Sequence, residues 1–426
     1  LEAARRTERA WAQPGEKPLL CGVPVSIKDL IYTTWLPTTH GSLLFKDYHH
    51  PTNAPVVDRV AAAGAVILGK TNTPEFGLLD MTYNRLRDEC RNPWDLDRTP
   101  GGSSGGAGAQ VAAALGPLSI GTDGAGSIRI PAMHCGIFGL KPTFGRIPHD
   151  GWKGAPHSSH QGPMTRTVRD SALIMQATAG PDIRDPLCIQ DTPPNFLETL
   201  DPRPLAGTRI AYSLDYGYLA VEPEIRQAVL DAAALLRELG CELFESHPPR
   251  RQNAPGEIDL TPADEYSYAL EICPDIDERL DELTDYGRRT IEAGCAALAW
   301  RHSSSSRRRD AWATAVRRWS DGFNFFLAPV MGALAPRHDE ERHFDADHPW
   351  PGTFLPLFNA AGNPAASVPF GFHSSGLPLA VQIAGRWGDD AGVLRVSAAI
   401  EAAHPWAGHW APFAREGVAQ KEGATA

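Results

Sequence analysis

A serine flanked by very small residues is the first feature of this sequence that could do chemistry. In the stretch GTDGAGSIRIP, residues 121–131, Ser127 follows a Gly-Ala-Gly run and lies shortly before Arg129. Because these residues lack bulk, several backbone N–H groups can converge on one point, and residues 128–131 have the pattern of a first helical turn whose dipole aims there too. That arrangement would stabilise the negative oxygen of an acyl-transfer intermediate. A glycine-rich turn with a capping serine would give the same string.

A second serine lies upstream, in GGSSG at residues 101–105. The letters match the GxSxG elbow of α/β hydrolases with Ser103 as nucleophile, but that elbow needs a buried strand just before the serine. The preceding residues, NPWDLDRTP, are polar and contain two prolines, so the elbow interpretation is weak. The residues that follow, GGAGAQVAAALGP, predict a closely packed helix ending at Gly116, and LSIGTD then predicts a short strand leading toward Ser127.

A lysine ends another short predicted strand. In GVPVSIKDL, residues 22–30, three apolar residues alternate with Pro24, Ser26 and Lys28. This alternation puts the lysine on the second face of the strand, where its ammonium group could point into a dry environment. A lysine on the surface of a strand would show the same pattern.

Strand-like and helix-like stretches alternate along the chain without a clear linker, which favours α/β layering in one large unit. The clearest example runs from TRIAYS (208–213) through a helix opened by Pro223 and closed before Gly240 to CELFES (241–246). Apolar residues recur at helical spacing within that helix, so one of its faces is expected to pack on a sheet. Residues 250–350, rich in proline, histidine and charge, are the most irregular third.

Three other patterns suggest sites that their context does not support. GAVILGKT (64–71) matches the phosphate-loop string GxxxxGK[ST], but its middle residues are bulky and apolar, so we interpret it as a buried strand. HDEERHFDADH (338–348) has metal-ligand residue types, yet His338 and His343 do not share a helix face, which favours a solvated acidic loop. The basic run SSSSRRR (303–309) is expected to be a solvated loop as well.

The overall composition narrows the class of protein. A chain of 426 residues with 42% hydrophobic residues can bury a large core, and its formal net charge of -11 disfavours nucleic acid or an anionic membrane as the main partner. No apolar run approaches the roughly 18 residues that span a bilayer, and the charged first residues do not look like a signal peptide, so we expect a soluble, cytoplasmic protein. The seven cysteines form no paired motif, which suggests neither a disulfide framework nor a zinc site.

One long segment resembles the signature segment of the amidase signature family: residues 101–146, GGSSGGAGAQVAAALGPLSIGTDGAGSIRIPAMHCGIFGLKPTFGR. Shorter stretches agree, GVPVSIKD with the family's lysine strand, GKTNTPEFG (69–77) and RNPWD (91–95) with its connectors, and GNPAASVPFGF (362–372) and GLPLAVQIAG (376–385) with its C-terminal strands. The resemblance runs from about residue 20 to the end and is weakest across residues 250–350.

Carried over by position, the resemblance implies a catalytic triad. Ser127 would be the nucleophile, Ser103 the bridging serine, preceded by a cis peptide bond, and Lys28 the base. The oxyanion would be bound by the backbone N–H groups of Gly124, Ala125, Gly126 and Ser127. A lysine base fits the chemistry, because serine needs a proton acceptor within reach and burial favours a neutral amine. Ser104, Asp123 and Arg129 would support the site, the last two as an ion pair that braces the loop.

The chain departs from the family pattern in three places. Ala125 replaces one glycine of the usual pair before the nucleophile, which is tolerable because the backbone N–H group acts rather than the side chain. Arg87, Asp88 and Glu89 stand where relatives are smaller and less charged, which would alter the rim of the pocket. The chain also starts close to the lysine strand, so we expect the family's N-terminal helices to be absent or trimmed.

The resemblance implies one domain over residues 1–426, an α/β/α layered fold with a mixed, mostly parallel, twisted central sheet covered by helices, in which 250–350 shapes the substrate site. It implies a serine amidohydrolase that cleaves C–N bonds through an acyl-enzyme, with no metal or other cofactor, as a monomer or homodimer. The substrate would be a small amide-like molecule: an apolar or aryl amide and also an aryl ester or carbamate, as for a urethanase. The alternative is a glutamine amidotransferase subunit of a tRNA-dependent amidation complex, and an inactive, binding-only relative is a third hypothesis.

Aromatic residues in the variable third suggest a substrate preference. They lie on both sides of the acidic loop: Trp319, Phe323, Phe325, Phe326, Trp350, Phe354 and Phe358. In related folds these segments close over the acyl site, so they could line an apolar pocket that favours uncharged groups. Ordinary core packing is the other interpretation, and it is favoured for Phe325 and Phe326, which lie in a strand-like run.

Overall fold

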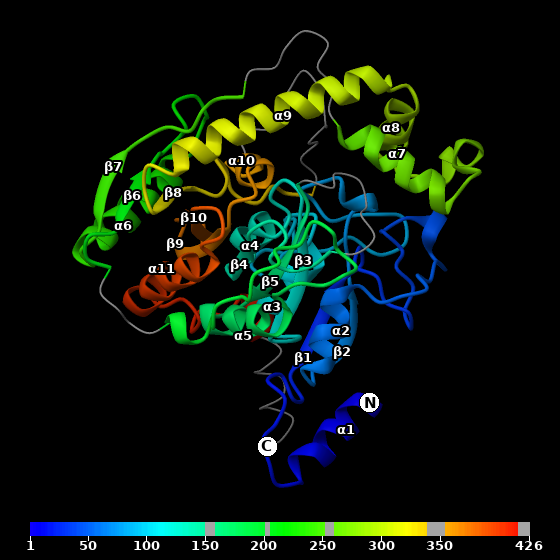
Figure 1. Ribbon diagram of the computed structural model, residues 1–426, viewed down its shortest axis with the longest axis horizontal. Helices are drawn as coiled ribbons and strands as arrows, with labels where there is room; N and C mark the ends of the chain where they lie inside the picture. The colour runs from blue at the N-terminus through cyan, green and yellow to red at the C-terminus, as the bar shows by residue number, and fades with distance from the viewer. Residues whose placement is uncertain (150–157, 201–204, 252–259, 339–353, 416–426) are drawn as a thin grey trace.

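One large sheet organises the molecule (Figure 1). The computed structural model describes residues 1–149, 158–200, 205–251, 260–338 and 354–415. Its ten strands follow the order β2-β1-β3-β5-β4-β9-β10-β8-β6-β7. They are β1 (Pro24–Lys28), β2 (Val66–Thr71), β3 (Leu118–Asp123), β4 (Phe138–Lys141), β5 (His160–Thr165), β6 (Arg209–Tyr212), β7 (Glu242–Glu245), β8 (Phe325–Pro329), β9 (Ala365–Phe372) and β10 (Pro378–Gly385).

The sheet is mixed, as expected, but it is not mostly parallel, and that part of the expectation was wrong. Among the described strands, four neighbouring pairs are parallel, at the two ends of the sheet: β1 with β2 and β3, and β6 with β7 and β8. The five pairs in the middle are antiparallel. Strands β5 and β9 run against their neighbours there, and the sequence pattern of a buried strand does not reveal the direction of its partners.

Helices cover both faces of the sheet. They are α1 (Glu2–Trp11), α2 (Pro55–Ala62), α3 (Gly105–Ala112), α4 (Arg129–His134), α5 (Val168–Thr178), α6 (Pro223–Glu238), α7 (Thr261–Ile272), α8 (Asp285–Cys295), α9 (Ala299–Ser320), α10 (Pro356–Ala360) and α11 (Asp390–Ala403). Helices α2, α5, α6 and α11 pack on one face, and α3 and α4 on the other. Strand alternation separates the two groups: Leu140 of β4 joins the first core, whereas Gly139 lies against Ala132 of α4.

Several elements agree with the sequence analysis. The unit β6-α6-β7 is present, and its two strands pair in parallel. The lysine strand is β1, the strand before Ser127 is β3, and the helical turn after Ser127 begins α4. Proline at the start of α6 and Gly240 after its end mark the boundaries of that helix.

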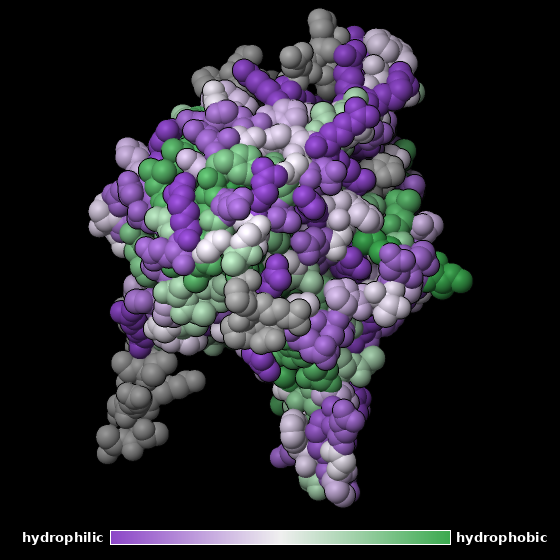
Figure 2. Space-filling view, turned by 60° about the vertical axis from the view of Figure 1, so that its left-hand side comes forward, coloured by the Kyte–Doolittle hydropathy of each residue, from purple (hydrophilic) through white to green (hydrophobic). Residues whose placement is uncertain are grey.

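Other elements differ from expectation. Residues 303–309 lie inside α9 rather than in a solvated loop, because Ser305 and Arg309, one helical turn apart, face inward while the other arginines face solvent. Strand β2 is not buried: it forms an edge of the sheet, and Leu68 is 53% exposed. Helix α1 is an N-terminal helix that was not expected; it projects from the lower end of the molecule in Figures 1 and 2. The acidic stretch after His338 lies outside the described residues.

The aromatic residues that could have lined a pocket are core residues instead, which is the interpretation favoured for Phe325 and Phe326. Phe323, Phe325, Phe326, Phe354 and Phe358 are at most 4% exposed. Ring contacts join Trp319, Phe323, Phe326 and Phe358, and Trp319 stands edge-on to Phe326 with a centroid separation of 4.8 Å. Phe325 packs in the larger core cluster instead. Trp350 lies outside the described residues. These rings fill the space between β8, α9 and α10, so core packing is the interpretation that holds.

Figure 2 shows a face on which hydrophilic residues are interspersed with small hydrophobic areas. Among the described residues, no helix combines the length and the apolar character that crossing a membrane requires.

Candidate active site

Two neighbouring parallel strands bring a lysine and a threonine to the same place. Lys28 is the last residue of β1, and Thr122 lies near the end of β3. The Lys28 side chain is fully buried. Its ammonium nitrogen Nζ lies 2.7 Å from Ser103 Oγ and 2.8 Å from Thr122 Oγ1. The expected contact between Lys28 and Ser103 is therefore present, and the lysine points into the protein rather than to its surface.

The segment carrying Ser103 lies directly beside the one carrying Ser127. The Gly102–Ser103 peptide bond is cis, as the resemblance implied. The backbone N–H of Ser104 donates to the carbonyl oxygen of Ser127 at 3.1 Å, and the Ser104 hydroxyl donates to the carbonyl of Thr122 at 3.0 Å. Ser104 thus joins the two segments. A side chain at Gly102 would collide with the backbone at Leu79, so only glycine permits this close approach.

The loop around Ser127 is arranged about one carboxylate. Asp123 accepts hydrogen bonds from the backbone N–H groups of Gly126, at 2.7 Å, and Ile128, at 3.2 Å. Ser127 therefore lies between two N–H groups anchored on the same side chain. Gly126 has a φ of +132°, and a side chain there would meet Leu355, so glycine is required.

The same geometry bears on the four expected oxyanion donors. The N–H of Gly126 is engaged by Asp123, whereas those of Gly124, Ala125 and Ser127 have no hydrogen-bond partner within the described part of the chain. Ala125 is exposed, and the space beside Gly124 is open. The Ser127 hydroxyl is half-buried and makes no hydrogen bond to a described residue. Within the described chain, three of the four expected donors are therefore unpaired, and the fourth, Gly126, is paired with Asp123.

The expected ion pair between Asp123 and Arg129 is present and completely buried. Arg129 donates from Nε to Asp123 Oδ2 and from Nη2 to Oδ1, both at 2.9 Å. Burial alone would raise the pKa of Asp123, but the Arg129 charge and the hydrogen bonds outweigh burial and hold the pKa well below its usual value. The carboxylate stays charged and keeps accepting from the loop.

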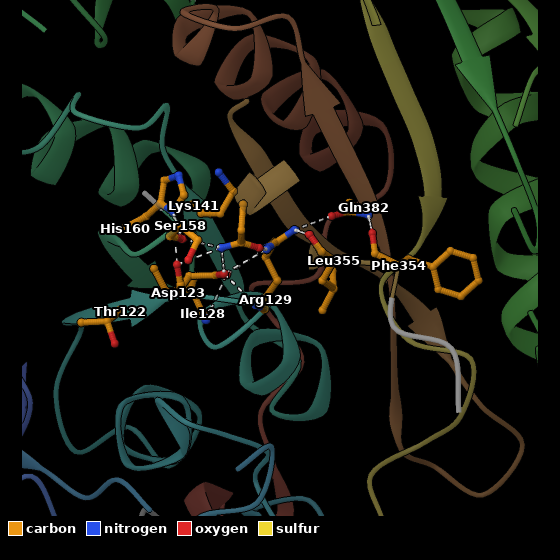
Figure 3. A network of polar contacts seen from close by, with 12 residues as sticks. Thr122, Asp123, Ile128, Arg129, Lys141, Ser158, His160, Phe354, Leu355 and Gln382 are labelled. Atoms are coloured by element: carbon orange, nitrogen blue, oxygen red, sulfur yellow. Dashed lines mark hydrogen bonds and ion pairs between the residues drawn. The ribbon is translucent and has the colours of Figure 1, made fainter. Parts of the chain in front are cut away.

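Further polar groups surround the guanidinium (Figure 3). Arg129 Nη1 donates to Gln382 Oε1 of β10 at 2.8 Å and to the carbonyl of Leu355 at 3.2 Å. Arg129 Nη2 also donates to Asn359 Oδ1 of α10 at 2.6 Å. Gln382 in turn donates to the carbonyl of Phe354 at 3.1 Å. The pair thus ties the loop after β3 to the C-terminal third of the chain.

Two more basic side chains lie on the far side of Asp123 (Figure 3). Burial lowers the pKa of Lys141 well below its usual value, and the Arg129 charge acts the same way. Burial also lowers the pKa of His160, with Lys141 adding to the shift. His160 Nδ1 lies 3.1 Å from the carbonyl oxygen of Asp123. Neutral forms of both side chains are therefore favoured, which limits the charge buried beside the ion pair.

A further lysine, only partly exposed to solvent, lies on the next strand. Lys70 of β2 is in register with Ile27 of β1, donates to Thr38 Oγ1 at 2.9 Å and pairs with Asp29 at 3.5 Å. Burial lowers the pKa of Lys70 to about 8, against the opposing effect of the Asp29 charge. It makes no hydrogen bond to either serine of the site in the described structure.

The charged residues expected at the rim of the site are on the surface. The rim residue Arg87 is exposed, and Glu89 pairs with His338 at 2.7 Å. Within the described residues, no group of three or more histidines, cysteines or carboxylates is placed to hold a metal ion. The sequence analysis did not identify Thr122, Asn359 or Gln382 as site residues. Of these, only Thr122 had a local signal: it lies between Gly121 and Asp123 on the predicted strand leading to Ser127, so its side chain is on the opposite face from theirs.

Comparison with known proteins assigns the chain to a family. The chain matches the Amidase family model over residues 1–394. The chain belongs to the amidase signature family. Its fold agrees: the crystal structure of a bacterial aryl acylamidase of the amidase signature family is similar with a TM-score of 0.84 and 29% identity, covering 95% of this chain and 87% of the other. The structure of 6-aminohexanoate cyclic dimer hydrolase gives a TM-score of 0.86 at 29% identity, covering 97% and 90%.

Curated relatives of this family member include a hydrolase and a component of an amidotransferase. An acylamidase from Rhodococcus erythropolis is 39% identical over 424 residues, which cover 91% of this chain and 82% of that protein. A glutamyl-tRNA(Gln) amidotransferase subunit from Roseiflexus castenholzii is 36% identical, covering 95% and 86%. Family membership and these relatives make the chain an enzyme, an amide hydrolase of the amidase signature type.

The buried ion pair generates a prediction about stability. Asp123→Asn should lower the free energy of unfolding by about 3 to 5 kcal/mol at neutral pH, because it leaves the Arg129 charge buried without its partner. The difference in unfolding free energy between parent and variant should become smaller below about pH 4. At that pH Asp123 binds a proton in the unfolded parent chain but not in the folded parent, so the parent loses stability. Urea titrations across pH measure both effects.

The control for that variant is Asp97→Asn, whose partner Arg337 lies 3.2 Å away in an exposed pair. Its effect should stay within about 0.5 kcal/mol at every pH. Equal effects of the two substitutions would contradict the importance of the buried pair.

Proposed function

We propose that the chain hydrolyses amides through an acyl-enzyme on Ser127, with Ser103 as the bridging serine and Lys28 as the base. The observation that carries the proposal is the 2.7 Å contact between Lys28 Nζ and Ser103 Oγ, made where the Ser104 N–H holds the Ser127 carbonyl. Exposure rises along the proposed relay, from the fully buried Lys28 through the buried Ser103 to the half-buried Ser127, whose hydroxyl makes no hydrogen bond to Ser103 in the described structure and would have to reach it when substrate binds. This is the order that a proton relay requires.

In the first step, Ser127 Oγ attacks the carbonyl carbon of the substrate and forms a C–O bond. Its proton passes to Ser103 Oγ while the Ser103 proton passes to neutral Lys28, so one proton leaves the nucleophile and one reaches the amine. The Thr122 hydroxyl, 2.8 Å from Lys28 Nζ, orients the base. The substrate carbonyl becomes a negatively charged oxygen within a tetrahedral intermediate.

Backbone N–H groups of the loop would bind that oxygen. Gly124, Ala125 and Ser127 supply the donors that the described structure leaves available, while the Gly126 N–H fixes the loop on Asp123. Removing a single such donor from an enzyme typically slows the reaction by about 10²- to 10³-fold.

Collapse of the intermediate breaks the C–N bond. The proton held by Lys28 returns through Ser103 to the leaving nitrogen, which departs as a neutral amine. Water then attacks the acyl-enzyme with the same relay accepting its proton, and the acid product and free Ser127 are released.

We infer that the preferred substrates are apolar or aryl amides, and that aryl esters and carbamates pass through the same acyl-enzyme. The acylamidase relative and the aryl acylamidase structure support this preference. The aromatic cluster around Phe326 does not, because it is core. The amidotransferase alternative rests on the similarity to the Roseiflexus protein, which extends over nearly the whole chain.

The proposed roles predict how substitutions at the triad combine. Ser127→Ala should abolish turnover of an aryl amide, by at least about 10³-fold in kcat, because the covalent bond cannot form. Ser103→Ala and Lys28→Met should each lose about 10²- to 10⁴-fold, and the double variant should be no slower than the slower single variant, since both groups serve one relay.

The matched control is Ser119→Ala, a buried serine of β3 that bonds Ser26 instead of the triad. It should keep activity within a few-fold of the parent. Additive losses at Lys28 and Ser103, or more than a tenth of parental activity in Ser127→Ala, would contradict the assigned roles.

A lysine base also predicts the pH dependence. The value of kcat/KM should rise through neutral into mildly alkaline pH, because only the neutral amine of Lys28 accepts a proton. Lys70 is the competing amine, since burial lowers its pKa to about 8. In Lys70→Met the rise should keep its midpoint; a lost or shifted midpoint would assign the profile to Lys70, and an acidic optimum would point to a different base.

The substrate preference separates the two candidate functions. We expect kcat/KM for a p-nitroanilide or an aryl carbamate to exceed that for glutamine, because a free amino acid carries charges that need paired partners once desolvated. Both substrates are measured on the same preparation with the Ser127→Ala variant as blank. A higher value for glutamine would favour the amidotransferase role.

A further inference from the structure

The position of Ser127 depends on the carboxylate of Asp123. Some hydrogen-bond partners of that carboxylate belong to the same loop, and others come from elsewhere in the fold. Asp123 accepts from Gly126 and Ile128 on either side of Ser127. Its partner Arg129 begins α4 immediately after the same loop, so it moves with the loop. An anchor that holds the loop in place must come from another part of the fold.

Asn359 of α10 is that anchor among the described side chains. Its amide Nδ2 lies 2.8 Å from Asp123 Oδ1 and 2.9 Å from the Asp123 carbonyl oxygen, and its Oδ1 accepts from Arg129 Nη2 at 2.6 Å. Within the described chain, no other side chain outside the loop and α4 donates a hydrogen bond to the Asp123 carboxylate. Asn359 is 1% exposed, so it has no water to exchange for these partners.

A third contact extends the anchor to a further segment. Asn359 Nδ2 also lies 3.2 Å from the carbonyl of Ser158, just before β5. The asparagine therefore joins three parts of the chain that are distant in sequence: the loop after β3, the start of β5, and α10. Figure 3 shows Asp123, Ser158 and Arg129 close to one another, with Leu355 and Gln382 beyond the guanidinium.

We propose that Asn359 is a positioning residue for the acylation step, setting the placement of the Ser127 nucleophile and its neighbouring N–H donors through Asp123. This inference rests on the proposed function of Ser127. Asn359 touches no reacting atom. It acts by fixing the Asp123 carboxylate, which accepts the hydrogen bonds that hold the loop. Small displacements of a nucleophile cost rate rather than binding, so the effect falls on kcat.

The test compares two buried asparagines of the same segment. Asn363 is fully buried and its amide donates to Gly385 and Ser320, without a side-chain contact to Asp123 or Arg129. Asn359→Ala should lower kcat for a p-nitroanilide by about 10- to 100-fold with KM changed less than about threefold, whereas Asn363→Ala should keep kcat within about threefold. Melting temperatures of both variants are recorded, because among the described residues the Asn359 side chain makes four hydrogen bonds and the Asn363 side chain two, so a larger loss of stability is expected for Asn359→Ala.

A second variant separates the two sides of the asparagine. Asn359→Asp keeps the shape and the oxygen facing Arg129 but replaces the donor to Asp123 with a carboxylate, so its kcat should fall at least as far as that of Asn359→Ala. Should Asn359→Ala not fold, Asn359→Ser, which keeps a small donor, takes its place with an intermediate loss.

A readout on the nucleophile completes the experiment. The rate at which a fluorophosphonate labels Ser127, followed by intact mass, should fall in parallel with kcat in the Asn359 variants. The positioning role would be overturned if the parent protein is labelled and turns over substrate but the Asn359 and Asn363 variants have equal kcat. The proposed function would stand in that case. Absence of labelling at Ser127 in the parent protein would overturn both.

Discussion

The arrangement of this site depends on one fully buried ion pair. A charge moved into a protein interior loses its hydration, and only close partners compensate for that loss. Arg129 and Asp123 compensate each other, but the guanidinium has further N–H groups that must also be satisfied. Gln382, Asn359 and the carbonyl of Leu355 satisfy them. The requirement to leave no buried donor unpaired thus draws β10 and the region of α10 onto the loop that carries Ser127.

The two halves of the candidate site have different kinds of support. Lys28 and Thr122 are held by adjacent strands whose hydrogen bonds and side-chain packing fix them in the sheet. Ser127 lies in a loop, where backbone hydrogen bonds of a sheet are missing and a side-chain acceptor has to replace them. In the proposed mechanism, a base held by the sheet beside a nucleophile on a braced loop leaves the nucleophile accessible to substrate while keeping it in position.

The sequence allowed prediction of features that depend on local pattern. Alternation placed Lys28 on an inward face, and the run of small residues before Ser127 indicated a tight loop followed by a helix; both agree with β1, β3 and α4. The sequence could not tell whether the aromatic residues line a pocket or pack in the core, because a phenylalanine such as Phe326 suits either environment. Residues 303–309 were misassigned since their charge suggested a loop, whereas the inward spacing of Ser305 and Arg309 is helical. Asn359 and Gln382 lie far from Asp123 in sequence, and no local pattern links them to it. The triad roles themselves stay predictions.

The strand order has a consequence for how the molecule is made. Strands β9 and β10, near the end of the chain, lie between β4 and β8, so the earlier strands form two separate groups until residues 365–385 have been synthesised. Of the partners of Arg129, Gln382 lies on that segment, and Leu355 and Asn359 come shortly before it. A growing chain on the ribosome therefore holds Lys28 and both serines long before it can bury the charges that shape the loop around them. The surroundings of the loop that carries Ser127 are therefore completed only after residues 355–385 have been synthesised, and long-range strand pairings of this kind slow folding.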